Sequence, residues 1–398
     1  MLFFIKPSYF LSVFVQISDF PGISSKCINL MTQTSIKYSN NKNIDFISLL
    51  RLRVKTYFDN HNLSKYANLN MVVKTIFMMT LYLTPYFLII SGITSNDWIN
   101  FGLWFLMGLG SAGIGLSIMH DANHGSYSKN QHVNKYLGYL LNFIGGSAVN
   151  WKLQHNYLHH GYTNIDGMDE DIDPGKVMRL SPHKKRYKIH RWQHIYGWFL
   201  YGLMTISWVT SKDYGQLKRY RDVGLLSRQN RSYKSLMTEL IILKIFFIAY
   251  LFVIPLIFSS SPWWKTIIFI AFMHFVQGFI LTIIFQPAHV MPDLEYPLPD
   301  DNGNVENHWA IHQMLTTSDF SPNSRLFSWY IGGLNYQIEH HLFPNICHVH
   351  YRKLSKIVRE TAKEFGVPYN VQSNFIAALI NHGRMLKNLG RNDLVNSQ

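Results

Sequence analysis

The chain contains four long stretches of apolar and small polar residues that carry no formal charge. They cover about residues 75–96, 98–119, 245–264 and 266–288. A helix that crosses a bilayer needs about 20 predominantly apolar residues, so each stretch predicts one membrane-spanning helix. Only a short polar turn separates the first stretch from the second, and the third from the fourth. The pattern therefore predicts an all-α, multi-pass membrane protein with four transmembrane helices in two hairpins and a helical cap.

Two further apolar runs do not predict spans. The run Trp192–Ser211 is rich in Trp and Tyr and has basic residues on its N-terminal side and at its end. This composition favours a helix lying in the membrane interface, with a fifth span as the alternative. The run Tyr136–Val149 is too short to cross a bilayer by itself.

Basic residues gather in the segments outside the hairpin turns. Lys and Arg number 37 against 23 Asp and Glu, and of the basic residues only Lys265 lies in a hairpin turn. Two hairpins place both ends and the middle segment on one side, and the positive-inside rule makes that side cytosolic. Four uncharged spans exclude a nucleic-acid-binding protein. The basic residues expected on the cytosolic side are Arg51, Arg53, Lys55, Lys184, Lys185, Arg186, Lys188, Arg191, Lys218, Arg219, Arg221, Arg352, Lys353, Lys356 and Arg359.

The chain divides into three parts. Residues 1–45 form an N-terminal extension, 46–377 the membrane domain, and 378–398 a C-terminal tail. The extension is expected to be poorly ordered, or to reflect a start placed upstream of Met31; its short apolar stretch also resembles the core of a signal peptide, without a convincing cleavage site. The two cysteines of the chain predict neither a disulfide framework nor a thiolate metal site.

Most of the nineteen histidines are clustered, and three clusters lie on the predicted cytosolic side. They contain His120 and His124; His155, His159 and His160; and His340 and His341. Residues at i and i+4 share a helical face, so the first pair, and likewise His155 with His159, can point at one metal. Adjacent histidines diverge by about 100° on a helix and can serve two metals. Seven histidines exceed the needs of one tetrahedral zinc site, although imidazole itself does not select the metal.

Other metal-binding patterns in the sequence are absent or weaker than these clusters. A zinc-peptidase His-Glu-x-x-His motif and a carboxylate-bridged di-iron Glu-x-x-His motif are both absent from the sequence. The acidic group near residue 170 can supply extra ligands, but a solvated loop, partners of the ligands, or a docking patch for a basic partner is favoured. It contains Asp166, Asp169, Glu170, Asp171 and Asp173. The remaining histidines that we expect not to bind metal are His183, His190, His194, His274, His308, His312, His348 and His350.

Around these residues the sequence resembles the membrane fatty-acid desaturases, whose mark is three histidine boxes. The resemblance covers about residues 46–377. The third box begins with Gln337 in place of His, a variant similar to that of the front-end desaturases, which act between an existing double bond and the carboxyl end of the acyl chain. A lipid hydroxylase or ketolase with the same boxes is the alternative. A metal transporter is disfavoured, because the histidines lie at the ends of the spans and not within them.

The resemblance also implies the cofactors and partners. It implies two iron ions with O2 as co-substrate, and an eighth ligand, His289, where the fourth span leaves the membrane. Gln337, Asp121 and Glu339 are expected to bind or to orient the ligands. The substrate is a fatty-acyl group carried by CoA, a carrier protein or a phospholipid. A His-Pro-Gly-Gly haem motif is absent from the sequence, so electrons are expected from a separate ferredoxin or b-type cytochrome.

Overall fold

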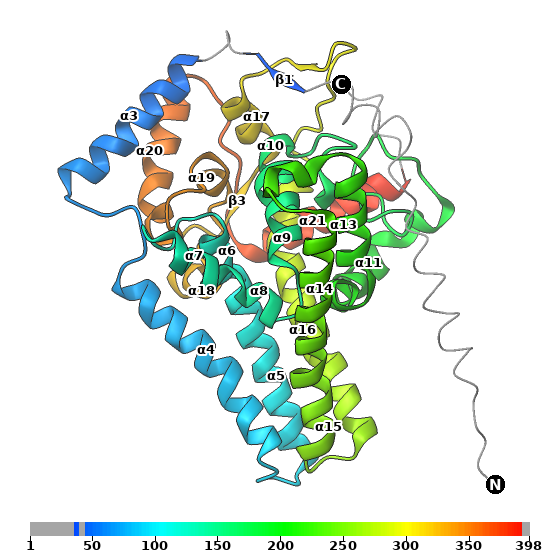
Figure 1. Ribbon diagram of the computed structural model, residues 1–398. Helices are drawn as coiled ribbons and strands as arrows, with labels where there is room; N and C mark the ends of the chain where they lie inside the picture. The colour runs from blue at the N-terminus through cyan, green and yellow to red at the C-terminus, as the bar shows by residue number, and fades with distance from the viewer. Residues whose placement is uncertain (1–35, 40–43, 392–398) are drawn as a thin grey trace.

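The computed structural model describes residues 36–39 and 44–391. Expectations for residues 1–35, including the alternative start at Met31, lie outside the described residues. The described chain is mostly helical with very little sheet, and four of its helices are long and apolar enough to cross a membrane, which confirms the predicted fold class (Figure 1).

The first two spans form one hairpin and the last two form another. The first span is α4 (Leu69–Ile90), and the second comprises α5 (Asp97–Gly113), the π-helical η1 (Ile114–Met119) and α6 (His120–Asn123). The third comprises α14 (Tyr233–Ile248), the π-helical η7 (Ala249–Val253) and α15 (Ile254–Phe258), and the fourth is α16 (Trp263–His289). Both hairpin turns lie at the end of the bundle away from the cap (Figure 1), where Lys265 pairs with Asp97.

Two spans begin earlier than the charge pattern predicted. α4 begins at Leu69 and not at residue 75, because Asn68 caps its first turn by accepting from the N–H of Met71. The third span begins at Tyr233 and not at residue 245. In each case a lysine, Lys74 or Lys244, interrupts the uncharged stretch, and the predicted span was therefore begun after it. Both lysine side chains are buried inside the protein.

The second span lies at the centre of the bundle. In its most apolar stretch of 18 residues, 67% of the residues are buried, against 33% in the first and third spans. The other residues of those two spans face outward, as lipid-facing residues would. Gly110 lets α5 approach α4 closely, because a Cβ there would lie 2.7 Å from the backbone nitrogen of Tyr82. Large apolar side chains fill the space between the spans, among them Met78, Trp104 and Phe247.

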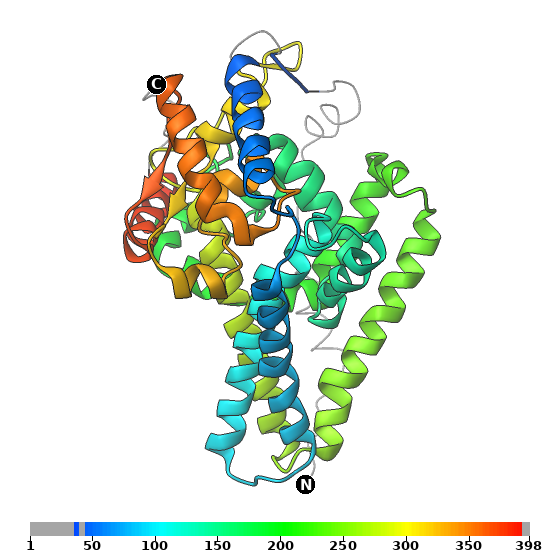
Figure 2. The ribbon, with the colours of Figure 1, turned by 90° about the vertical axis from the view of Figure 1, so that its left-hand side faces the viewer.

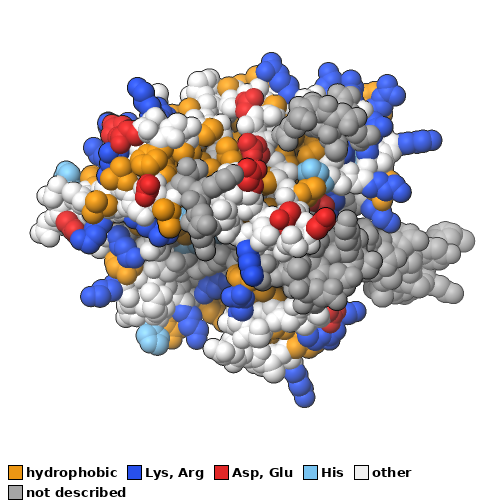
Figure 3. Space-filling model, turned by 90° about the horizontal axis from the view of Figure 1, so that it is seen from above, with side chains coloured by type: hydrophobic (Ala, Val, Ile, Leu, Met, Phe, Trp, Pro, Cys, Tyr) orange, Lys and Arg blue, Asp and Glu red, His pale blue; other side chains and the backbone are white. Residues whose placement is uncertain are grey.

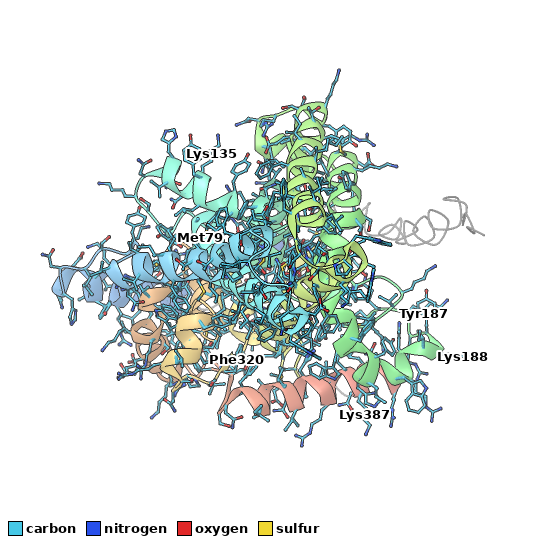
Figure 4. All side chains as sticks on the ribbon, turned by 90° about the horizontal axis from the view of Figure 1, so that it is seen from below. Met79, Lys135, Tyr187, Lys188, Phe320 and Lys387 are labelled. Atoms are coloured by element: carbon cyan, nitrogen blue, oxygen red, sulfur yellow. The ribbon has the colours of Figure 1, made fainter. Side chains whose placement is uncertain are left out.

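The remaining elements form a cap at one end of the bundle. Viewed from the span ends, cap helices reach well beyond the bundle, with Lys135, Lys188 and Lys387 near their outer edges (Figure 4). α3 (Ile44–Asn60) and α20 (Tyr351–Glu364) lie side by side (Figure 2), where Arg53 forms an ion pair with Glu364 at 2.7 Å. The helices between the second and third spans are α7 (Gln131–Gly138), α8 (Leu140–Phe143), α9 (Ala148–Trp151), η2 (Lys152–His159), α10 (His160–Tyr162), η3 (Glu170–Ile172), η4 (Lys188–Trp192), α11 (Gln193–Gly202), α12 (Met204–Ser207), η5 (Trp208–Lys212), α13 (Asp213–Asp222) and η6 (Leu225–Gln229).

The elements after the fourth span complete the cap. Besides α20, they are β2 (Asn304–Val305), α17 (Trp309–Thr316), β3 (Asp319–Phe320), α18 (Arg325–Tyr330), α19 (Gln337–Leu342), η8 (His348–His350), β4 (Val371–Gln372) and α21 (Phe375–Arg391). β3 and β4 pair in parallel, and β2 pairs in parallel with β1 (Lys37–Tyr38). The weaker apolar run forms α11, α12 and η5, which pack against α16 and are not among the four spans found in the described residues.

Both expected domain ends fall inside packed structure. α21 crosses the boundary expected at residue 377, and Met385, Leu386 and Leu389 bury their side chains against the cap. His382 of the same helix accepts a hydrogen bond from the Tyr201 hydroxyl at 2.7 Å. At the other end, β1 belongs to the part of the chain expected to be poorly ordered, yet it pairs with β2.

Candidate metal centre

The three histidine clusters meet where the spans enter the cap (Figure 1). α6 carries the first cluster, η2 and α10 carry the second, and α19 carries the third, while His289 ends α16. Seven of the eight expected ligands form two adjoining groups whose ring nitrogens lie within 4.8 Å of one another. The first group is His120, His124, His155 and His340, and the second is His159, His289 and His341.

His160, the eighth histidine, lies between the two groups. Its Nε2 is 3.0 Å from Nε2 of His340 and 3.3 Å from Nε2 of His155. It also forms a group with His340 and His341. The adjacent histidines of the third box thus lie one in each of the two groups, and both lie near His160.

The i,i+4 pair of the second box is divided between these two groups, although His155 and His159 also form a group with Asp171. The rings of His155 and His159 are stacked with centroids 5.2 Å apart, but they face different neighbours. Both carboxylate oxygens of Asp169 lie 3.1 Å from Nδ1 of His159. This contact turns the His159 ring towards His289 and His341, at centroid distances of 4.6 and 4.9 Å.

In several of these histidines, one ring nitrogen faces away from the other rings and contacts an oxygen atom of a neighbouring residue. We call it the outer nitrogen, and the other one the inner nitrogen. Nδ1 of His341 donates to Oε1 of Gln313 at 2.7 Å, and Nδ1 of His289 lies 3.2 Å from the carbonyl oxygen of Thr316. Nδ1 of His340 lies 3.3 Å from the Tyr351 hydroxyl. Metal-binding histidines usually have one ring nitrogen held in this way, which fixes the ring and leaves the other nitrogen for the metal.

The inner nitrogens fit a bound metal. The Nε2 atoms of His120, His124, His289 and His341 are buried, and none has a hydrogen-bond partner among the described residues. Buried polar atoms are rarely left without a partner, so atoms of this kind aimed at one another call for a cation between them. Imidazole is a suitable ligand for iron. The residues present therefore fit the iron that the family resemblance implies.

Burial keeps most of the rings outside the spans in the neutral form that binds metal. It lowers the pKa of His124, His155, His160 and His341 well below the usual value for histidine, and the neighbouring rings lower it further. For His159, burial also lowers the pKa, but the carboxylates of Asp169 and Asp171 outweigh it and leave the pKa above its usual value.

The acidic group near residue 170 faces inward. Besides Asp169, Oδ2 of Asp171 lies 3.4 Å from Nδ1 of His159. Glu170 accepts hydrogen bonds from Arg219, Tyr220 and Gln216 of α13. These three carboxylates therefore contact a candidate ligand or tie the second box to α13, whereas the partly exposed Asp166 and Asp173 pair with Lys184.

The three further candidate residues have different surroundings. Oδ1 of Asp121 lies 3.7 Å from Nδ1 of His120. Gln337 is buried, and its amide oxygen and nitrogen have no hydrogen-bond partner among the described residues, as for the inner ring nitrogens. Glu339 differs from the expectation, because its described hydrogen bond is to the Tyr369 hydroxyl and not to a histidine. On a helix, its side chain points about 100° away from that of His340.

Most of the histidines that we expected not to bind metal form hydrogen bonds with backbone atoms. Nε2 of His312 lies 2.8 Å from the carbonyl oxygen of Thr163, and His308 caps α17. His183 and His190 contact the carbonyls of Tyr296 and Lys176. His348 instead binds a side chain, since its Nδ1 donates to Asp121 at 2.8 Å.

Two contacts near the centre had no signal in the sequence. The Tyr38 hydroxyl donates to the carbonyl of Gly161 at 2.7 Å, so β1 covers the second box. Gln313 accepts from His341 and from Thr163, and donates to the carbonyl of His160. The distance of Tyr38 and Gln313 from the boxes in the sequence gives no indication of these contacts, because only the fold brings the two residues next to the histidines.

Several known proteins are similar in sequence to this chain over most of its length. A fatty acid desaturase family model matches residues 96–373. The chain is 35% identical over 364 residues to the sn-1 linoleoyl-lipid 6-desaturase of Arthrospira platensis, covering 91% of this chain and 97% of that protein. It is 34% identical over 369 residues to an acyl-lipid (8-3)-desaturase of Physcomitrium patens, covering 90% of this chain and 74% of that protein. The chain therefore belongs to the fatty acid desaturase family, iron-using oxidoreductases that act on fatty-acyl lipids.

Proposed function

We propose that this protein is a front-end acyl-lipid desaturase with a two-iron centre. It would insert a cis double bond between an existing double bond and the carboxyl end of an acyl chain esterified in a lipid, with O2 as co-substrate. The observation that carries the proposal is the pair of adjoining histidine groups with buried, unpartnered nitrogens. The Gln337 variant of the third box and the similarity to a linoleoyl-lipid 6-desaturase support the front-end type.

In this proposal the protein holds the metals and keeps water away. His120, His124, His155 and His340 would bind one iron, and His159, His289 and His341 the other, with His160 between them. Iron with O2 supplies an oxidant able to remove hydrogen from an unactivated methylene, which no side chain can do. Asp169, Gln313 and Tyr351 fix the rings from outside. Seven of the eight histidines are buried, and Nε2 of His124 is buried as well, which limits side reactions with solvent.

We infer that the protein crosses the membrane four times with its metal centre on the cytosolic side. Lys and Arg are spread around the cap face in the view from above (Figure 3), whereas the opposite end carries Lys265 paired with Asp97. This distribution supports a cytosolic cap. A basic cap also suits a separate, acidic electron carrier such as a ferredoxin or a b-type cytochrome.

The proposal is tested by product analysis and iron content together. Expression in a host fed a panel of defined fatty acids should yield a product with one new double bond nearer the carboxyl end than those already present, identified by gas chromatography. Purified protein should contain about two iron atoms per chain. A hydroxylated product would favour the hydroxylase alternative, and a single zinc after anaerobic iron loading would contradict the two-iron centre.

Gln337 is expected to tune the centre. Gln337→Ala removes a buried amide that can bind or hold a water near the metal, so we expect turnover to fall about 10- to 100-fold, the usual cost of losing a residue that supports a metal site. Gln337→His supplies an imidazole and should retain more activity than Gln337→Ala. Product formation and iron content are compared in the same membranes, with exposed Gln131→Ala as the control. An alanine variant with wild-type rate and iron would show that Gln337 has no role at the metals.

A further inference from the structure

A buried lysine of the first span reaches towards the metal centre. Lys74 of α4 is 1% exposed, and its Nζ lies 2.6 Å from Nε2 of His348. Nδ1 and the backbone N–H of His348 both donate to Oδ2 of Asp121, at 2.8 and 3.1 Å. Oδ1 of the same carboxylate lies beside Nδ1 of His120. Lys74, His348 and Asp121 thus form a continuous chain of contacts, which we call the latch, from the first span to the first histidine box.

The directions of the hydrogen bonds in the latch follow from its chemistry. An ammonium group can only donate, so Nε2 of His348 must accept from Lys74. The proton of the neutral ring is then on Nδ1, facing the carboxylate that accepts it. A buried lysine and a buried aspartate therefore balance each other through a neutral imidazole, and each polar atom of the His348 ring has a partner.

The ammonium group also explains why this cluster is not another metal site. Asp121, Cys347 and His348 have donor atoms within 4.8 Å of one another, a spacing that could hold a metal ion. Nε2 of His348 already contacts Nζ of Lys74, and Nδ1 already donates to Asp121, so both ring nitrogens are taken. The cation of this cluster is the lysine itself.

The latch joins three separate parts of the chain. Lys74 belongs to the first span, Asp121 to α6 and His348 to η8, which follows the third box. It therefore fixes the segment that carries His120 against the segment behind His340, and these two rings have centroids 4.5 Å apart. A lysine inside a span is costly unless it is paired, which argues for a specific role of this residue.

We propose that Lys74 and His348 are positioning residues, which set the orientation of Asp121 and the placement of His120 for metal binding. The proposal rests on the proposed metal centre and adds to it two residues outside the histidine boxes. Neither residue belongs to either group of candidate ligands. They act through Asp121, and their effect is on the affinity and geometry of the metal bound by the first group.

The test measures metal binding without turnover. Purified metal-free protein is titrated with Co2+ alone, and the visible absorption of the bound ion reports its affinity and ligand geometry. The wild-type protein should bind two Co2+ ions. In His348→Leu and in Lys74→Met, one of the two should bind about 10- to 100-fold more weakly, with a changed spectrum, since this is the usual effect of losing a residue that orients a ligand.

A double variant and a conservative variant sharpen the result. Because both residues act through one carboxylate, Lys74→Met combined with His348→Leu should bind no more weakly than His348→Leu alone. His348→Gln should regain most of the affinity, since its amide can accept from Lys74 and donate to Asp121. His350→Leu is the matched control, a buried histidine of the same short helix whose ring contacts Phe58 and the backbone of residues 64 and 66.

Several outcomes would overturn the proposal. They are unchanged binding of both ions in Lys74→Met and His348→Leu, losses that multiply in the double variant, or an equal loss in His350→Leu. If His348→Leu does not fold, Lys74→Met and His348→Gln decide. A wild-type protein that binds a single Co2+ would contradict the two-iron centre, while a weaker affinity for that ion in the variants would still support the latch.

Discussion

Replacing His160 with Ala is expected to abolish desaturation and to release most of the bound iron. The ring of His160 lies between the two histidine groups, with its Nε2 3.0 Å from His340 and 3.3 Å from His155. Its removal takes a ligand from the centre and leaves a buried gap at the contact between the two sites. The loss should therefore exceed the ~10- to 100-fold typical of residues that only support ligands. Product formation and iron per chain are measured on the purified variant.

The same substitution at an exposed histidine provides the control. His132 lies on α7, close in sequence to the first box, and its side chain is exposed. His132→Ala should keep both iron and activity, and His160→Ala should remain folded and inserted in the membrane, because its ring contacts the centre and not the lipid-facing core. A His160→Ala protein with two irons and wild-type turnover would remove His160 from the proposed ligands.

The convergence of the box histidines could be predicted because spacing and topology act together. Uncharged stretches fixed the order of the spans, and two hairpins then placed all three clusters at one end. The spacing did not reveal how the second box divides, because the contact of Asp169 with His159 depends on the loop that follows. His289 was expected only from the family resemblance, as a single histidine at the end of a helix carries no spacing signal.

The outer partners of the rings could not be predicted for a different reason. Gln313 and Tyr351 are polar residues of ordinary spacing, and they reach His341 and His340 only because α17 and α20 pack around α19. His348 was expected not to bind metal, as a residue that merely follows the third box in the sequence. The fold instead brings it to Asp121, more than two hundred residues away in the sequence.

The predicted starts of the first and third spans were wrong because a charged residue was taken to mark the end of a span. A charged side chain in lipid is costly, so a lysine marks the end of a predicted span. The rule fails where the charge is inside the protein with partners. Lys74 contacts His348, and Lys244 contacts Asp213 together with two backbone carbonyl oxygens. Both helices therefore continue beyond the lysine that seemed to end them.

Lys244→Met is expected to destabilise the protein more than any other change outside the metal centre. Nζ of Lys244 donates to Oδ2 of Asp213 at 2.6 Å and to the carbonyl oxygens of Gly145 and Trp208 at 2.6 and 2.7 Å. The two charged side chains are only 3% and 5% exposed. Methionine leaves the carboxylate of Asp213 buried without its counter-charge, which typically costs about 3–5 kcal/mol. The free energy of unfolding is measured by denaturant titration in mixed micelles.

Two further variants separate the ion pair from its surroundings. Lys234→Met, at an exposed position of the same helix, should change the free energy of unfolding by no more than ~0.5 kcal/mol. Lys244→Met with Asp213→Leu removes both charges and should recover much of the lost stability, because an apolar pair can replace a buried ion pair at little cost. If the double variant is as unstable as Lys244→Met, the uncompensated carboxylate is not the cause. The loss would then come from the carbonyl oxygens of Gly145 and Trp208, which lose their contact with Nζ of Lys244.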